Sequence, residues 1–122
     1  MNPLATLTNI YWKLLSLGET PVLMAKGQQR EASFQMREDR NNGVRGFAGC
    51  NQLAGAATTS GNDLTIEQLA LTRRAGIGGM ETESAFVNAL EATRYFSIHE
   101  HSIRLLNAGK KPIAIFEAQH FN

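Results

Sequence analysis

Cysteine is nearly absent from this chain of 122 residues, since Cys50 is the only one. A single cysteine cannot form a disulfide within the chain, so the redox compartment cannot be inferred from cysteine pairing. An excess of charge of either sign is lacking as well, because twelve Lys and Arg residues against eleven Asp and Glu residues give a formal net charge of +1. The field of the whole protein therefore offers no strong attraction for nucleic acid or for an anionic membrane.

Long hydrophobic runs are also missing. No apolar stretch approaches the ~20 residues of a membrane-spanning helix, and the first residues lack the basic and apolar regions of a secretory signal. Two alternatives stay open. Either the protein is intracellular, or a signal peptide was removed and Met1 was added in its place. The sequence has no internal repeat, low-complexity tract or proline-rich linker either, so we expect a single domain over residues 1–122.

Alternation of apolar and polar residues is the main secondary-structure signal that is present. It predicts short strands separated by turn-forming segments, at residues 10–15, 32–36, 44–47, 55–59, 64–66, 95–98, 103–105 and 113–115. The strong turn signal at residues 41–43 indicates that the second and third of these strands pair as a hairpin. Turns at residues 99–102 and 107–110 predict that the last three strands run antiparallel.

One helix is expected, from about Met80 to Ala92. Phe86 and Leu90 lie four residues apart, alanines favour the helix, and Glu81 and Glu83 suit the positive end of its dipole. The resulting fold class is α+β: a small, strongly curved or barrel-like antiparallel sheet, with this helix packed on it and its two large apolar side chains directed inward. Such curvature limits the exposed strand edges that a flat sheet of short strands would leave.

The most unusual stretch is Gly46-Phe47-Ala48-Gly49-Cys50-Asn51, followed by Gly55. Glycine tolerates positive φ and close backbone approach, and asparagine can bond its own backbone in a turn, so the grouping requires an unusual chain path. No histidine or acidic residue lies within it to activate the thiol. We interpret the stretch as a structural hinge between the hairpin and a strand of small residues, with Cys50 packed inside and inert.

Other candidate site residues have a structural alternative that we favour. Trp12 and Phe34 could line an apolar ligand pocket inside a small barrel, but core packing is the commoner arrangement. His99 and His101 could bind a metal together with His120, although a turn between strands is the simpler interpretation. The sequence therefore indicates no catalytic residues, no cofactor and no metal site, and we expect Arg45 and the Arg73-Arg74 pair to lie in solvent.

Several segments together resemble the META domain family, which includes the HslJ-like bacterial heat-shock proteins (DUF306). The resemblance covers nearly the whole chain and is carried by residues 10–14, 46–51 with Gly55, 64–66, 72–75, 80–86 with Leu90, and the three late strands. Glu83 aligns with the family's glutamate, and its position near a helix N-terminus predicts bonds to backbone amides or to a neighbouring loop.

This resemblance implies a function only in outline. Similar proteins are bacterial, often exported or lipid-anchored, and linked to stress or antibiotic tolerance without an established reaction. It implies a non-enzymatic, monomeric interaction or stability module of the bacterial envelope or stress response, with an unidentified protein partner; the alternative is a carrier of a small apolar ligand. It implies a periplasmic or outer-membrane-associated location if a signal was removed, and a cytoplasmic location otherwise.

One departure from the family concerns a disulfide. Similar proteins often carry a second cysteine after the threonine-x-x-alanine segment, where this chain has Gly76. If Gly76 occupies the place of that cysteine, its Cα is expected within ~7 Å of the Cα of Cys50, which is the reach of a disulfide. The loss of the partner weakens the inference of an oxidising compartment.

Overall fold

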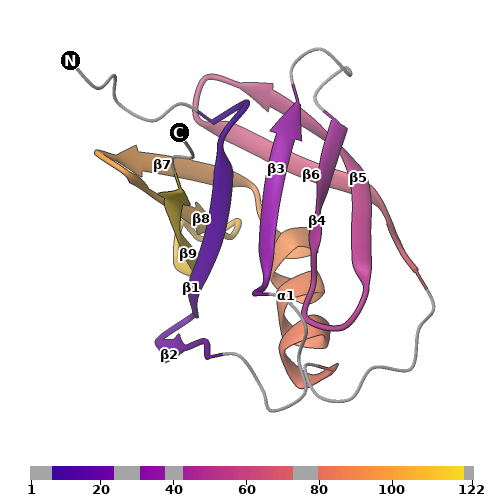
Figure 1. The fold of residues 1–122 in the computed structure, drawn as a ribbon. Coiled ribbons are helices and arrows are strands. Elements are labelled where there is room, and N and C mark those ends of the chain that lie inside the picture. Colours follow the sequence, from indigo (N-terminus) through magenta and orange to yellow (C-terminus); the bar gives the residue numbers. More distant parts are fainter. Residues whose placement is uncertain (1–6, 24–30, 38–42, 73–79, 120–122) are drawn as a thin grey trace.

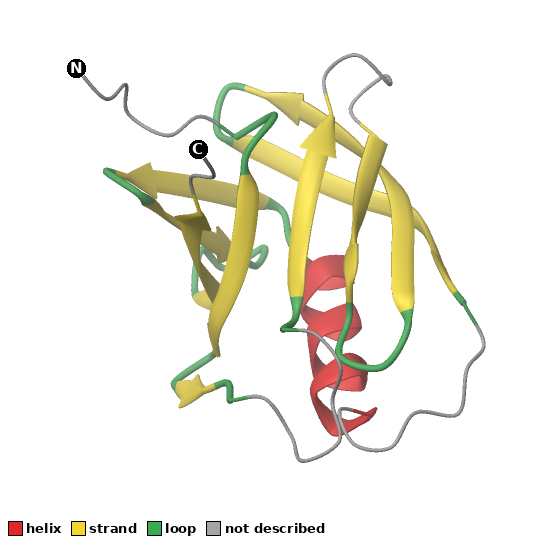
Figure 2. Ribbon diagram, in the orientation of Figure 1, coloured by secondary structure: helices red, strands yellow, loops and turns green. Residues whose placement is uncertain are grey.

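The computed structural model describes residues 7–23, 31–37, 43–72 and 80–119. These residues form nine strands and one helix (Figures 1 and 2). The elements are β1 (Tyr11–Leu17), β2 (Thr20–Pro21), β3 (Ser33–Arg37), β4 (Gly43–Phe47), β5 (Gln52–Ser60), β6 (Asp63–Leu71), α1 (Met80–Ala92), β7 (Tyr95–His99), β8 (Ser102–Leu106) and β9 (Pro112–Gln119). The α+β class, the helix boundaries, the β3–β4 hairpin and the three closing strands are all confirmed.

The strands make one antiparallel sheet that curves into a ring. Its order is β2-β1-β3-β4-β5-β6-β7-β8-β9, and an additional pairing of β1 with β9 closes the circle. The weakest link lies between β6 and β7, whose described residues pair only at Asp63 and Tyr95. Helix α1 connects these two strands and contacts β6, β1 and β9, so it covers the region where they diverge (Figure 1).

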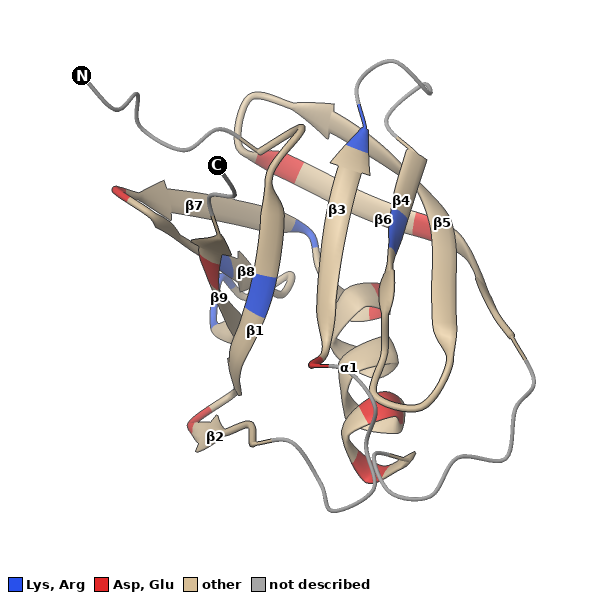
Figure 3. Ribbon diagram, in the orientation of Figure 1, with Lys and Arg blue, Asp and Glu red and all other residues tan. Residues whose placement is uncertain are grey.

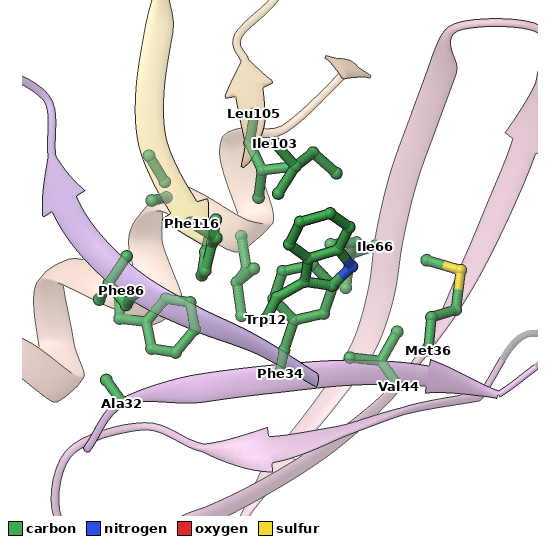
Figure 4. Close-up of a cluster of buried hydrophobic side chains, with 14 of the residues drawn as sticks. Trp12, Ala32, Phe34, Met36, Val44, Ile66, Phe86, Ile103, Leu105 and Phe116 are labelled. Atoms are coloured by element: carbon green, nitrogen blue, oxygen red, sulfur yellow. The ribbon is translucent and has the colours of Figure 1, made fainter. Parts of the chain in front are cut away.

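The interior of the ring is filled by large apolar side chains from the strands and from α1 (Figure 4). Trp12, Phe34, Phe86 and Phe116 are each fully buried. The rings of Phe34 and Phe116 pack edge to face with centroids 4.8 Å apart, and Phe86 lies 5.7 Å from Phe116. Since Leu90 is fully buried as well, the inward direction expected for the apolar face of α1 is confirmed.

Two adjacent strands, β5 and β6, are longer than the sequence predicts. The small residues of β5 give no clean apolar alternation, so the pattern marked only its middle, yet nine residues join the sheet. In β6 the register shifts at Gln68, whose φ of 57° marks a bulge that hides the strand period. The two-residue strand β2, which pairs with the end of β1, was not predicted from the sequence.

Charged residues of both signs are spread over the strands, whereas the charged residues of α1 are all acidic (Figure 3). The presence of both signs agrees with the small net charge of the sequence. Helix α1 has 13 residues, and none of the helical segments within the described ranges has the length and apolarity that crossing a bilayer requires.

Candidate functional site

The Gly-Cys-Asn stretch forms the tight turn that joins β4 to β5. The amide of Ala48 donates to the carbonyl oxygen of Asn51 at 2.8 Å, which leaves Gly49 and Cys50 at the tip. Gly49 has a φ of 131°, a value that residues with side chains rarely adopt, so the turn requires glycine there. The stretch lies where it was expected, between the β3–β4 hairpin and the strand of small residues β5, and it takes the form of a tight hairpin turn whose strands pair from Phe47↔Gln52 onward.

Gly46 allows β3 and β4 to lie close together. It lies in β4 opposite Phe34 of β3, and a Cβ at this position would overlap the carbonyl oxygen of Ser33 and come within 2.8 Å of the Cα of Phe34. Any side chain here would therefore push β3 and β4 apart. Gly55 similarly faces the bulged part of β6, where a Cβ would lie 3.1 Å from the carbonyl oxygen of Glu67.

Glu83 fastens the start of α1 to this turn. Its side chain is only 4% exposed. Oε1 accepts hydrogen bonds from the amides of Asn51 at 2.6 Å and Cys50 at 3.2 Å, and Oε2 accepts one from Nδ2 of Asn51 at 3.0 Å. These contacts are the bonds to backbone amides of a neighbouring loop that the position of Glu83 predicted, although the identity of the loop could not be inferred from the sequence.

A second set of hydrogen bonds extends this arrangement to the residue that follows β6. The hydroxyl of Thr72 donates to Oδ1 of Asn51 at 3.2 Å and accepts from the amide of Gln52 at 3.0 Å. We call Glu83, Cys50, Asn51, Gln52 and Thr72 the Glu83 network. It ties together three segments that are distant in sequence, and no buried side-chain polar atom of the described residues is left without a partner.

Cys50 is half-buried, not packed inside as expected, because it occupies the tip of a two-residue turn. Its amide is engaged by Glu83. Gly76, the position compared with a second cysteine, lies outside the described residues, as do Arg73 and Arg74.

Trp12 and Phe34, the predicted lining of an apolar ligand pocket, belong to the packed core. Both side chains have 0% exposure. The indole Nε1 of Trp12 donates to the carbonyl oxygen of Leu7 at 3.1 Å, so its polar edge is satisfied within the protein. A ligand could enter this region only by displacing core side chains, which favours core packing, the alternative that the sequence analysis preferred.

The two described histidines lie at the β7–β8 turn. His99 ends β7, His101 stands in the turn, and both are exposed. They border a hollow of about 430 Å³ together with Glu100, Ser102, Glu117 and Ala118. Within the described part of the chain no group of three His, Cys, Asp or Glu residues is arranged to hold a metal ion, and His120 lies outside that part.

A second hollow of about 430 Å³ lies over β3, β4, β5 and the end of β6, and we call it the outer hollow. It is lined by Tyr11, Ser33, Phe34, Gln35, Arg45, Gly46, Gln52, Leu53, Ala54, Ala70, Leu71 and Thr72. This hollow was not predicted from the sequence. Alternation along β3 and β4 could have placed Gln35 and Arg45 on the outward face, but nothing local predicts that Ala54 and Ala70 lie beside them. Arg45 is exposed, as expected, yet it borders this hollow.

Comparison with known families gives one clear result. The sequence model of the META domain matches residues 5–120 of the chain. A search of curated proteins finds no match.

Solved structures share the fold at low sequence identity. An NMR structure of a protein from Burkholderia xenovorans matches with a TM-score of 0.76 and 18% identity, over 99% of this chain and 92% of that one. A second protein studied by NMR matches with a TM-score of 0.67 and 20% identity, over 91% of this chain and 90% of that one. The crystal structure of a DUF4847 family protein from Bacteroides vulgatus matches with a TM-score of 0.56 and 15% identity, over 75% and 61% of the two chains. At these identities the likeness shows the fold alone.

Proposed function

Because this chain belongs to the META domain family, we propose that it is a non-enzymatic interaction or stability module of the bacterial envelope or stress response. The observation that carries the proposal is the use of the family's signature residues. Both carboxylate oxygens of Glu83 accept hydrogen bonds, one from the amides of Asn51 and Cys50 and the other from the side chain of Asn51. A carboxylate whose two oxygens accept three hydrogen bonds from one turn has a structural role, because it fixes that turn to the helix.

The position of Cys50 supports the same conclusion. A nucleophilic cysteine needs a base or a cation that favours the thiolate. Glu83, the acidic residue that binds this turn, accepts a hydrogen bond from the main-chain amide of Cys50. This contact involves the main chain of Cys50 and not its thiol. The signature therefore accounts for the shape of the turn without any chemical step.

A complementation experiment tests the non-enzymatic role. A bacterial strain that lacks the gene is exposed to heat and to envelope stress, and its survival is compared after supply of the wild-type chain, Cys50→Ala and Glu83→Gln. We expect Cys50→Ala to restore survival fully and Glu83→Gln to restore it less, since only the second change weakens the fold. Purified protein is also assayed against panels of ester, peptide and phosphate substrates. Turnover that disappears in Cys50→Ala would refute the proposal.

We further propose that the protein acts as a monomer on a protein partner, and that it is periplasmic or associated with the outer membrane. The scattered charges favour a protein partner over a nucleic acid (Figure 3). Cell fractionation of bacteria that express the complete gene tests the location. Recovery with a cytoplasmic marker enzyme would establish the alternative location and contradict the envelope role.

The carrier hypothesis, a small apolar ligand inside the curved sheet, is less well supported because Trp12 and Phe34 are fully buried by their neighbours. Titration of the chain with apolar ligands while the fluorescence of Trp12 is recorded tests it directly. A saturable change in the emission would favour the carrier over the interaction module.

A further inference from the structure

We propose that the outer hollow binds a small organic anion, a carboxylate on a compact apolar body, with Arg45 as the residue that binds the anion. This inference goes beyond the proposed function and does not depend on it. It rests on four features of the hollow: its place in the sheet, its cation, its apolar lining and the rigidity of one of its walls.

The hollow follows from which residues face outward on adjacent strands. Tyr11, Gln35, Arg45, Ala54 and Ala70 are successive register partners across β1, β3, β4, β5 and β6. Three members of this row have long side chains, and the last two are alanines. Directly opposite residues in a sheet lie only about 5 Å apart, so the long and the short side chains are close neighbours. Space remains above the alanines, and its volume of about 430 Å³ falls within the usual range of small-molecule sites, roughly 300–1,000 Å³.

Arg45 provides the charge for the ligand. Its side chain is exposed and forms no hydrogen bond or ion pair with any other described residue. It also borders a smaller hollow of about 210 Å³ that includes Arg37 and Gly43, so a second cation lies nearby on β3. A guanidinium presents paired donors that match the two oxygens of a carboxylate, and the amides of Gln35 and Gln52 on the same lining add further donors.

The rest of the lining selects for more than charge. Ala54, Ala70 and Leu71 are exposed and give the hollow its apolar surface, whereas Phe34 and Leu53 border it with side chains that are buried in the core. Leu71 is 37% exposed, a large apolar side chain that a ligand would remove from water. An inorganic anion would leave this apolar surface unused, whereas an organic anion with a ring or a short branched chain would cover it.

One wall is held in place before any ligand arrives. Gln52 and Thr72 line the hollow and belong to the Glu83 network, in which the hydroxyl of Thr72 bonds both Asn51 and the amide of Gln52. A wall that is already ordered lowers the entropic cost of binding. The signature turn and the start of α1 thus support the site without contacting the ligand.

A titration followed by ¹H–¹⁵N NMR tests the proposal. The probes are benzoate, the neutral benzamide of nearly the same shape, and inorganic phosphate. We expect benzoate to shift the amide signals of β3, β4 and β5 around Arg45 saturably, with a dissociation constant on the order of 1 mM for a ligand of this size. Benzamide and phosphate should bind at least about tenfold more weakly, since each lacks one of the two recognition elements.

Three variants locate the site. Arg45→Gln removes the charge and Ala54→Leu fills the hollow, and each should weaken benzoate binding about tenfold or more. Arg104→Gln is the matched control, because Arg104 is an exposed arginine of β8 away from the hollow, and it should leave binding unchanged. The ¹H–¹⁵N spectrum of each variant establishes that it is folded.

The remaining outcomes overturn the proposal. Absence of a saturable shift at the solubility limit of benzoate refutes the site, and equal binding of phosphate refutes the organic anion. Equal binding of benzamide refutes the role of Arg45, as does a loss of binding in Arg104→Gln that equals the loss in Arg45→Gln. Each result is independent of the complementation experiment, so the two proposals can fail separately.

Discussion

Replacement of Glu83 by glutamine is expected to destabilise the protein more than any change of charge at an exposed position of the same helix. The glutamine side chain can still accept hydrogen bonds through its oxygen, from the amides of Asn51 and Cys50. Its NH₂ group, however, then faces Nδ2 of Asn51, which is itself a donor. One of the three bonds is therefore lost and the other two are no longer charge-assisted.

The magnitude follows from these three bonds. A hydrogen bond to a charged group contributes roughly 1.5–3 kcal/mol, against roughly 0.5–1.5 kcal/mol between neutral groups. Loss of one bond and weakening of two by about 1–1.5 kcal/mol each amounts to about 3.5–6 kcal/mol, and relief of the desolvation of a carboxylate that is 4% exposed offsets part of it. We expect a net loss of roughly 1.5–3 kcal/mol in the free energy of unfolding, a large share of the roughly 5–15 kcal/mol that holds a typical domain folded.

The matched control is Glu81→Gln. Glu81 lies in the same first turn of α1, carries the same charge and is exposed. Its replacement removes only the interaction with the helix dipole, worth roughly 0.3–1 kcal/mol. Urea unfolding followed by the fluorescence of Trp12, which is fully buried in the native state, measures both variants.

Equal free energies of unfolding for Glu83→Gln and Glu81→Gln would refute the reasoning, since the Glu83 network would then contribute nothing. Asn51→Ala and the double variant complete a cycle. We expect a coupling energy of about 1–3 kcal/mol between Glu83 and Asn51, and additive losses would show that the two side chains act independently.

Three further predictions concern the core, a close strand contact and the missing cysteine. Leu90→Ala should lower the free energy of unfolding by about 2–5 kcal/mol, because the side chain is fully buried, and a near-neutral result in urea unfolding would place it outside the core. Gly46→Ala should cost about 1–3 kcal/mol, since its Cβ would overlap a main-chain carbonyl of β3, while Gly109→Ala, where the nearest atom lies at 3.5 Å, serves as the control; equal effects in thermal unfolding would contradict this. Gly76→Cys should form a disulfide with Cys50 under air oxidation and raise the Tm, and a thiol count that stays at two would show that the alignment of this segment is wrong.

The architecture could be predicted because several of its signals are local. The helix has one apolar face, on which Phe86 and Leu90 lie four residues apart, and both side chains are fully buried. The late strands alternate cleanly and are bounded by turn residues. By contrast, β5 consists largely of Ala, Gly and Thr, whose small side chains give no contrast between faces, and the bulge at Gln68 interrupts the period of β6.

The candidate site was harder to predict because the pairing register of neighbouring strands decides which side chains lie beside one another in it. Whether Arg45 faces Ala54 or Gly55 depends on where the β4–β5 turn places its two tip residues. A shift of one residue would reverse the face of every side chain on one strand. The identity of the partner of Glu83 depends on the same turn, so the residue could be singled out from its helix position while Asn51 and Thr72 could not be assigned to it.

The signature residues bind together the segments on either side of the connection from β6 to α1. Strands β6 and β7 pair only at Asp63 and Tyr95 among the described residues, so the far end of β6 gains little from its neighbour in the ring. Helix α1 follows β6 in the chain and packs against it. Glu83 binds the start of this helix to the β4–β5 turn. Thr72, which is the residue after β6, forms a hydrogen bond with the same turn. Side-chain hydrogen bonds thus hold the β4–β5 turn, the residue after β6 and the start of α1 together, which gives the most distinctive residues of the chain a structural role.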